Sequence, residues 1–266
     1  MIQAIDRAAR VLHALQGARH LGISELAREL DLAPSTVHGI VQSLREHGLV
    51  VKERGSQRYR LGPMLLKMSN VFLDTHEVRA RAMQWTRELA RRTGLSTRLG
   101  VDLFDEVLIV HHNRRPDGSQ QMYETGLTIP AHASAMGKVL LAYHPQLARQ
   151  VTDAPLRPLT GDTIVDPEAL LATLPGIVAN TLAHERDEAV LGESAIAAPI
   201  ADRTGEVVAA IEVVLPTSDI PPDPQIGNHV RETARTISRE LGWREWPPPA
   251  PVESTDGEEV PDQPEG

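Results

Sequence analysis

The 266-residue chain is long enough for one large domain or two of modest size. It contains no cysteine, which excludes disulfides, thiolate zinc sites and cysteine nucleophiles. No apolar run approaches the ~20 residues that a membrane span needs. The N-terminus also lacks the apolar segment of a signal peptide, so we expect a soluble cytoplasmic protein.

The net charge of −9 is unevenly distributed along the chain. Residues 1–64 carry +3, residues 65–246 carry −6, and the last 20 residues carry −6. The basic surplus therefore lies at the N-terminal end, where it could contact phosphates. The last 20 residues contain six acids and six prolines, and this composition predicts a disordered acidic tail over residues 247–266.

The first 62 residues have the pattern of a winged helix-turn-helix domain. Ser24 is the expected N-cap of the second helix, and Pro34 suits the first position of the third. Apolar spacing predicts helices over residues 2–15, 25–30 and 34–48, and then a hairpin of two short strands over 49–53 and 58–61.

The chain that follows is predicted to be α+β. Pro63 begins a helical stretch that continues to about Arg92 with a break near Asp74, so residues 63–76 are expected to form a linker helix and residues 77–246 the second domain. Strands are predicted over 97–101, 107–112, 194–200 and 207–215, and helices over 133–143, 167–182 (interrupted at Pro175–Gly176) and 225–241.

The helix-turn-helix pattern predicts DNA binding, because the third helix of residues 1–62 would enter the major groove. Its outward side chains are short or hydrogen-bonding, and the hairpin carries four basic residues suited to the phosphate backbone. The alternative is a small helical domain with a solvated polar face, which leaves the basic hairpin unexplained. The candidate DNA-binding residues are Ser24, Pro34, Ser35, Thr36, His38, Gly39, Gln42, Ser43, Arg45, Lys52, Arg54 and Arg58.

Enzyme and metal-site interpretations have weak support in the sequence. Ser134 does not lie in a G-x-S-x-G nucleophile turn, and Gly137–Lys138 lacks the other residues of a phosphate-binding loop. The neighbours His111 and His112 would point to opposite faces of a strand, so they cannot easily share a metal. We therefore assign no catalytic residue, metal site or cofactor. A pure protein-interaction module is a third class, but it would leave the basic hairpin without a role.

Three runs in the first domain, Ile23–His38, Leu44–Val50 and Tyr59–Gly62, resemble the DNA-binding domain of the IclR family of bacterial transcription regulators. Two runs of the second domain, Leu127–Ala142 and Gly205–Ile211, resemble that family's other domain. The resemblance implies an α+β fold class. Its parts would be an N-terminal winged helix-turn-helix, a linker helix and a C-terminal GAF-like α/β effector-binding domain with an antiparallel sheet around a small pocket.

The resemblance also implies which residues line the effector pocket. Family members that bind small carboxylic acids often place hydroxyl or thiol groups on two of its strands, where this chain has Ala195, Glu212 and Val214. A carboxylate that faces the pocket would repel anions and favour a neutral polyhydroxy ligand. The alternative places Glu212 at a solvated edge. The implied pocket residues are Ala131, Met136, Leu140, Glu185, Ala195, Glu212 and Val214.

Further runs, Phe72–Ala82, Ile109–His112 and Arg115–Asp117, are similar to one subgroup, the glycerol-operon regulators of actinomycetes. The similarity implies a repressor with glycerol or a glycerol phosphate as the first candidate effector. The alternative is an activator of a catabolic operon that senses a small organic or aromatic acid. The expected partners are a palindromic double-stranded DNA operator and further copies of the chain, as a homodimer or a dimer of dimers (homotetramer).

Overall fold

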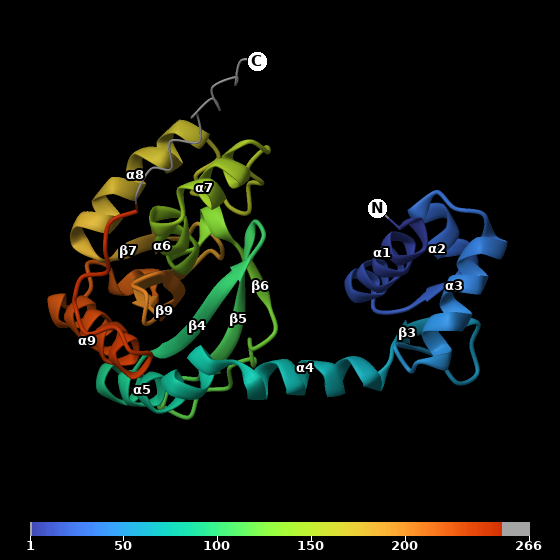
Figure 1. The fold of residues 1–266 in the computed structure, drawn as a ribbon, viewed down its shortest axis with the longest axis horizontal. Coiled ribbons are helices and arrows are strands. Elements are labelled where there is room, and N and C mark those ends of the chain that lie inside the picture. The colour runs from blue at the N-terminus through green and yellow to red at the C-terminus, as the bar shows by residue number, and fades with distance from the viewer. Residues whose placement is uncertain (1, 252–266) are drawn as a thin grey trace, which may run out of the picture. The chain divides into compact units, whose positions relative to one another are not determined.

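The computed structural model describes residues 2–251 and divides into two units at His76 and Glu77. The first unit contains three helices, a three-stranded sheet and a further helix that ends at the division (Figure 1). The sheet is antiparallel with strand order β1-β3-β2. Its elements are α1 (Gln3–Ala18), β1 (Leu21–Gly22), α2 (Ile23–Leu30), α3 (Pro34–Glu46), β2 (Val50–Lys52), β3 (Arg58–Leu61) and α4 (Pro63–Thr75).

The core of the first unit lies where α1, α2 and α3 meet. Val11, Leu26 and Val37, one from each helix, are completely buried there, and Tyr59 of β3 covers the same cluster. Because the buried positions recur with helical spacing, this part was predictable from the sequence. The expected cap was wrong, however: Gly22 is the N-cap of α2, and its amide donates to Glu25 Oε2 at 2.7 Å.

Helix α4 differs from the other helices of this unit in having no buried residue. It begins at Pro63 directly after Gly62, where a Cβ atom would lie 2.1 Å from the carbonyl oxygen of Gly48. Only glycine therefore allows the hairpin to pass this close to the end of α3. Four large apolar side chains of α4 are exposed: Leu66, Met68, Val71 and Phe72.

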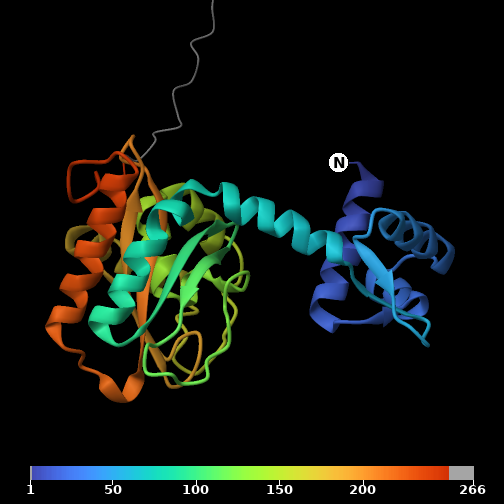
Figure 2. The same ribbon diagram turned by 90° about the horizontal axis from the view of Figure 1, so that it is seen from below.

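The second unit is built on a six-stranded antiparallel sheet with strand order β6-β5-β4-β9-β8-β7 (Figures 1 and 2). Strands β4, β8 and β9 are mostly buried. Nearly continuous apolar runs predict this for β8 and β9, whereas β4 begins with the polar residues Ser96, Thr97 and Arg98. The strands are β4 (Ser96–Leu103), β5 (Glu106–Asn113), β6 (Thr128–Pro130), β7 (Ala183–Arg186), β8 (Glu193–Ala201) and β9 (Val207–Pro216).

Helices cover both faces of this sheet. Two of them, α5 (Glu77–Thr93) and α9 (Pro224–Glu240), pack on each other and on one face. The other face is covered by α6 (Ala135–Tyr143), which also packs on η1 (Ala131–Ala133), α7 (Pro145–Thr152) and α8 (Pro167–Asn180). A short 3-10 helix, η2 (Thr217–Asp219), follows β9.

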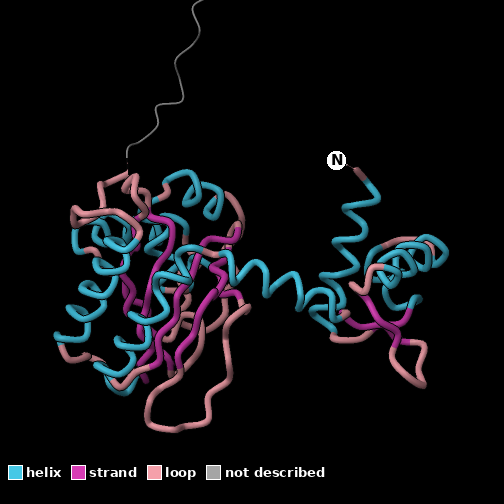
Figure 3. Tube along the Cα trace, turned by 60° about the horizontal axis from the view of Figure 1, so that its bottom comes forward, coloured by secondary structure: helices cyan, strands magenta, loops and turns pink. Residues whose placement is uncertain are grey.

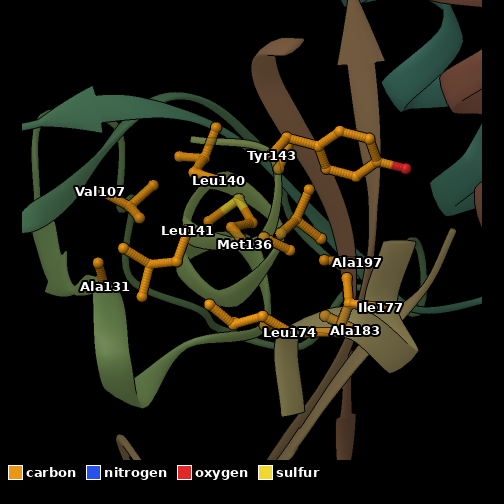
Figure 4. Close-up of a cluster of buried hydrophobic side chains, with 14 of the residues drawn as sticks. Val107, Ala131, Met136, Leu140, Leu141, Tyr143, Leu174, Ile177, Ala183 and Ala197 are labelled. Carbon is orange, nitrogen blue, oxygen red and sulfur yellow. The ribbon is translucent and has the colours of Figure 1, made fainter. Parts of the chain in front are cut away.

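All nine residues of α6 are buried, so this helix forms the centre of the larger core (Figure 4). Met136 and Leu140 lie in this cluster together with Ala131 of η1. Gly137 permits the close approach of η1, because a Cβ atom there would lie 2.1 Å from the carbonyl oxygen of Ala131. The sequence G-K in this segment therefore has a packing role.

The structure differs from the sequence expectations at short or interrupted elements. Strands β6 and β7 and helix α7 were not predicted. Helix α8 continues through Pro175, because this residue lies on the exposed side, where solvent can reach the carbonyl group that the proline leaves unbonded. The tail expected from residue 247 onward begins with ordered contacts, since Pro248 is buried. Residues 252–266 lie outside the described residues.

No helix within residues 2–251 is long and apolar enough to cross a membrane.

Candidate functional sites

The first candidate site is a groove of about 980 Å³ in the first unit, between α3 and the β2–β3 hairpin. The hairpin projects from its two strands as a loop (Figure 3). The polar side chains of the groove come from three segments: the start of α2, the outer face of α3 and the hairpin. They are Ser24, Glu25, His38, Gln42, Arg45, Lys52, Ser56, Gln57 and Arg58.

Hydrogen bonds arrange the cations of this groove. Arg58 forms an ion pair with Glu25 at 2.9 Å, and Lys52 donates to Gln57 Oε1 at 2.5 Å. Arg45 donates to Gln42 Oε1 at 2.7 Å on α3. Arg54, at the exposed hairpin turn, makes no ion pair within residues 2–251. Its charge is therefore available to an incoming anion such as a phosphate.

The expected DNA-binding residues fall into two groups in the structure. Six of them line the groove: Ser24, His38, Gln42, Arg45, Lys52 and Arg58. The other six lie outside its lining, and all but the half-buried Thr36 are exposed: Pro34, Ser35, Thr36, Gly39, Ser43 and Arg54. Val37, Val41 and Leu44 fix α3 against the core, so the outward face of the helix is held rigidly.

The second candidate site is a cavity of about 250 Å³ in the second unit, which we call the Arg98 cavity. The volume is below the ~300–1,000 Å³ of sites for drug-sized molecules, so it suits a compact ligand. Every strand of the large sheet except β5 contributes to its wall. The lining residues are Arg98, Thr128, Ile129, Pro130, Ser134, Ala135, Arg157, Leu159, Glu185, Ala189, Val190, Glu193, Ala195 and Glu212.

Arg98 is the buried cation of this cavity, with a side chain only 10% exposed. Its guanidinium contacts three carboxylates: Nε donates to Glu124, Nη1 to Glu212 at 3.2 Å and Nη2 to Glu193 at 3.2 Å. Burial lowers the pKa of Arg98, but these carboxylates, Glu212 foremost, outweigh it and raise the pKa above its ordinary value. The guanidinium is therefore permanently charged.

Glu212 lies in the middle of β9 and is 1% exposed. Complete burial raises its pKa, while Arg98 and the backbone amide of Met136 act in the opposite direction. Its second oxygen, Oε2, has no hydrogen-bond partner among the described residues. Glu212 therefore lines the cavity with an unsatisfied acceptor, not at a solvated edge as one alternative had it.

Glu185 of β7 is a second buried carboxyl group in the cavity wall. Its Oε2 accepts a hydrogen bond from the amide of Glu188 at 3.1 Å. Burial is the main cause that raises the pKa of Glu185 to about 8. At neutral pH this group is mostly protonated, so it can donate a hydrogen bond to a ligand.

Residues 114–127, which join β5 to β6 and which we call the strap, are attached to the sheet next to Arg98. Glu124 binds Arg98 through its side chain, and its amide donates to His112 Nδ1 at 3.3 Å. Tyr123 lies edge-on to the His112 ring, and Arg114 lies over the Tyr123 ring. Desolvation lowers the pKa of His112, so this histidine is neutral and can accept the hydrogen bond.

Lys138 of α6 is buried beside the cavity and forms an ion pair with Glu188 at 2.5 Å. This pair connects α6 to the loop after β7, whose amide group holds Glu185. The lysine of the G-K sequence is therefore a structural residue. The described residues contain no cluster of three or more metal-ligating side chains.

The structure separates the expected pocket residues. Glu185, Ala195 and Glu212 line the Arg98 cavity, whereas Ala131, Met136, Leu140 and Val214 lie in the hydrophobic core (Figure 4). Position-by-position inference missed Arg98, Glu124 and Glu193. Glu212 did carry a signal, because it is a charged residue in the middle of an apolar strand. Arg98 is a charged residue within the strand predicted over 97–101, and such residues need a partner when they are buried.

Comparison with known proteins shows that the two domains that contain these sites match one protein family. Residues 4–54 match the IclR helix-turn-helix domain, and residues 71–239 match the domain described as bacterial transcriptional regulator IclR C-terminal. The chain belongs to the IclR family. It is a DNA-binding transcription regulator with a C-terminal domain that responds to a metabolite.

Two relatives share a name that is more specific than the family description. The chain is 40% identical over 246 residues to the glycerol operon regulatory protein of Streptomyces coelicolor. It is 41% identical over 246 residues to the protein of the same name from Streptomyces griseus. In both cases the match covers 91% of this chain and 97% of the relative.

Solved structures of the family have the same fold. An IclR transcriptional regulator of Silicibacter sp. TM1040 superposes with a TM-score of 0.79 at 26% identity, over 90% of this chain and 96% of that one. An IclR homologue of Microbacterium hydrocarbonoxydans, solved in complex with 4-hydroxybenzoate, gives a TM-score of 0.75 at 25% identity. That match covers 90% of this chain and 99% of the other.

The pKa of Glu185 predicts how stability depends on pH. The unfolded chain releases this proton near the ordinary value of 4.5, whereas the folded chain keeps it until about pH 8. Between these values the folded state binds more protons, so the contribution of Glu185 to stability falls as pH rises. Glu185→Gln should therefore raise the free energy of unfolding at pH 8 relative to pH 5 by on the order of 2 kcal/mol compared with wild type.

Denaturant unfolding of the full chain at pH 5 and pH 8 measures this difference. The glutamine keeps an acceptor for the amide of Glu188, so local hydrogen bonding is retained. Glu206→Gln, which removes an exposed carboxylate between β8 and β9, is the matched control and should preserve the wild-type pH dependence. Parallel pH profiles for wild type and Glu185→Gln would contradict the prediction.

Proposed function

We propose that this protein is a repressor that binds a palindromic operator and releases it when glycerol or a glycerol phosphate occupies the Arg98 cavity. The observation that carries the proposal is the 40–41% identity to two glycerol operon regulatory proteins over almost the whole chain. The small volume of the cavity supports a ligand of this size. We propose no catalytic step for this protein, and its relatives are transcription regulators.

The candidate DNA contacts divide into two roles. The exposed side chains of α3, with His38 and Gln42 at its centre, would read base edges in the major groove, together with the half-buried Thr36. Arg54 and Arg58 of the hairpin would contact phosphates and set overall affinity. Arg58 must exchange Glu25 for a phosphate, whereas Arg54 has no ion pair to exchange within the described residues.

The proposed assembly is a dimer or a dimer of dimers. One recognition helix reads only a few base pairs, and two-fold pairing reads both halves of a palindrome. Helix α4 supports a contact with a second copy, because Leu66, Met68, Val71 and Phe72 expose apolar surface to solvent. Ile2 and Ile5, at and near the start of α1, are also exposed and could extend the contact.

Arg54→Ala should weaken binding to operator and unrelated DNA alike and reduce the salt dependence of affinity. One lost phosphate contact lowers the slope of log K against log salt by about 0.9, so a dimer that loses two contacts should lose about 2. Fluorescence anisotropy across a salt series measures this slope. Arg203→Ala, which removes the same charge from an exposed turn of the second unit, should leave it unchanged. A change in base preference would refute the phosphate-contact role of Arg54.

The double substitution Met68→Glu/Phe72→Glu should yield a monomer with much weaker operator binding. These positions are four residues apart on α4, so both charges appear on one face. Light scattering after size-exclusion chromatography measures the mass. Gln150→Glu, which adds a charge at an exposed position of α7 in the second unit, is the control and should remain a dimer. If the double variant has the mass of wild type, α4 is not the contact.

The proposed function itself is tested with labelled DNA from upstream of the protein's own gene. Glycerol or glycerol 3-phosphate should weaken operator binding at least tenfold, which corresponds to a coupling free energy of about 1.4 kcal/mol. Anisotropy titrations with and without each compound measure the coupling. A compound that strengthens DNA binding would instead indicate an activator, and the absence of any effect would remove both compounds as effectors.

A further inference from the structure

The Arg98 cavity has two features that bind anions in proteins: a buried arginine and a helix N-terminus. The guanidinium of Arg98 lies in its wall, and the wall also contains Ser134 and Ala135, the N-cap and first residue of α6. Backbone amides in the first turn of a helix attract negative charge. An anionic ligand would be expected to bind between these two features.

The first of these features, the guanidinium of Arg98, is already occupied by the chain's own carboxylates. Each of the three guanidinium nitrogens of Arg98 donates to a different glutamate: Glu124, Glu193 and Glu212. The backbone amide of Met136, in the first turn of α6, lowers the pKa of Glu212 and so favours its charged form. Glu124 and Glu193 alone carry twice the opposite charge of the guanidinium. A ligand anion would therefore meet surplus negative charge in a partly desolvated cavity.

The groups left over in the cavity suit hydroxyl groups. Glu212 Oε2 is buried with no hydrogen-bond partner among the described residues, so it can accept a hydrogen bond from a ligand hydroxyl group. A guanidinium has five N–H groups, of which Arg98 uses three, so two remain to donate to ligand oxygens. A hydroxyl group both donates and accepts, and a diol can satisfy both residues at once.

We propose that the Arg98 cavity selects a small neutral polyol and rejects anions, including the phosphate ester of the same polyol. This inference rests on the proposed function and narrows its effector to one chemical class. Arg98 and Glu212 are the specificity-determining pair, and Glu193 and Glu124 supply the surplus charge. Relatives can bind acids, as the complex of the Microbacterium homologue with 4-hydroxybenzoate illustrates. The exclusion of anions from the Arg98 cavity must therefore come from this chain's own residues.

Arg157 also lines the cavity, but it does not restore an anion site. Its side chain is exposed, and water weakens the attraction between an exposed cation and an anion. The carboxylates around Arg98 are less solvated and oppose an anion more strongly at the same distance. The cavity therefore remains unfavourable to anions with Arg157 at its wall.

Calorimetric titration of the full-length chain with glycerol, glycerol 3-phosphate and pyruvate tests the proposal. We expect glycerol to bind wild type at least tenfold more tightly than either anion. Glu193→Gln removes one surplus charge from a side chain that is 40% exposed, so it should fold and bind glycerol 3-phosphate at least threefold more tightly than wild type. Glu206→Gln, the control outside the cavity, should match wild type for all three compounds.

Glu212→Gln probes the second residue of the pair. This substitution should weaken the binding of glycerol and strengthen the binding of the two anions. The reason is that an amide accepts fewer hydrogen bonds than a carboxylate and carries no charge. Circular dichroism and operator binding without ligand establish that this variant is folded.

Tighter binding of glycerol 3-phosphate or pyruvate than of glycerol to wild type would overturn the neutral-polyol proposal. If that compound also releases the operator, the regulator function stands and only the charge selection fails. If no compound binds and none releases the operator, the proposed effector fails together with the selection. The anisotropy titrations thus separate failure of the charge selection from failure of the proposed function.

Discussion

The second unit is organised around the buried guanidinium of Arg98. Moving a full charge out of water costs several kcal/mol, and this cost is tolerable only when the charge is paired and hydrogen-bonded. The three carboxylates that pair with Arg98 come from three separate segments: Glu124 from the strap, Glu193 from β8 and Glu212 from β9. Because each of them must reach the same group, the ion cluster fixes the position of the strap relative to the centre of the sheet.

A second buried ion pair, Lys138–Glu188, lies next to Glu185 of the cavity wall. It joins α6 to the loop after β7, and the amide of Glu188 in turn holds the carboxyl group of Glu185. A ligand that contacts Glu185 and Glu212 would touch both ion networks at once. Arg98 lies near the start of β4, directly after α5, and α5 follows α4 in the chain. The chain therefore provides a short covalent path from the cavity to the linker helix.

The sequence predicts the first unit better than the second, and the reason is physical. Val11, Leu26 and Val37 follow helical periodicity, which any window of the sequence reveals. The N-cap at Gly22 was missed because its partner, Glu25, acts through a side chain that bonds back to a backbone amide. In the second unit, β6 and β7 are too short to show a period. They are defined by their pairing with β5 and β8, respectively.

The cavity residues were also only partly predictable, because some of their contacts join positions that are far apart in the sequence. Family resemblance implied Glu185, Ala195 and Glu212, which line the cavity in the structure, together with Met136, which does not line it and packs in the hydrophobic core. No local pattern could reveal that Arg98 and Glu212, which are 114 positions apart, form an ion pair across adjacent strands. Met136 instead packs beside Gly100, where a Cβ atom would lie 2.8 Å from its sulfur. The charge of the cavity comes from the glutamates that Arg98 requires. A compact cavity whose cation is already matched by its own carboxylates has room for a few hydroxyl groups and no charge left for an anion.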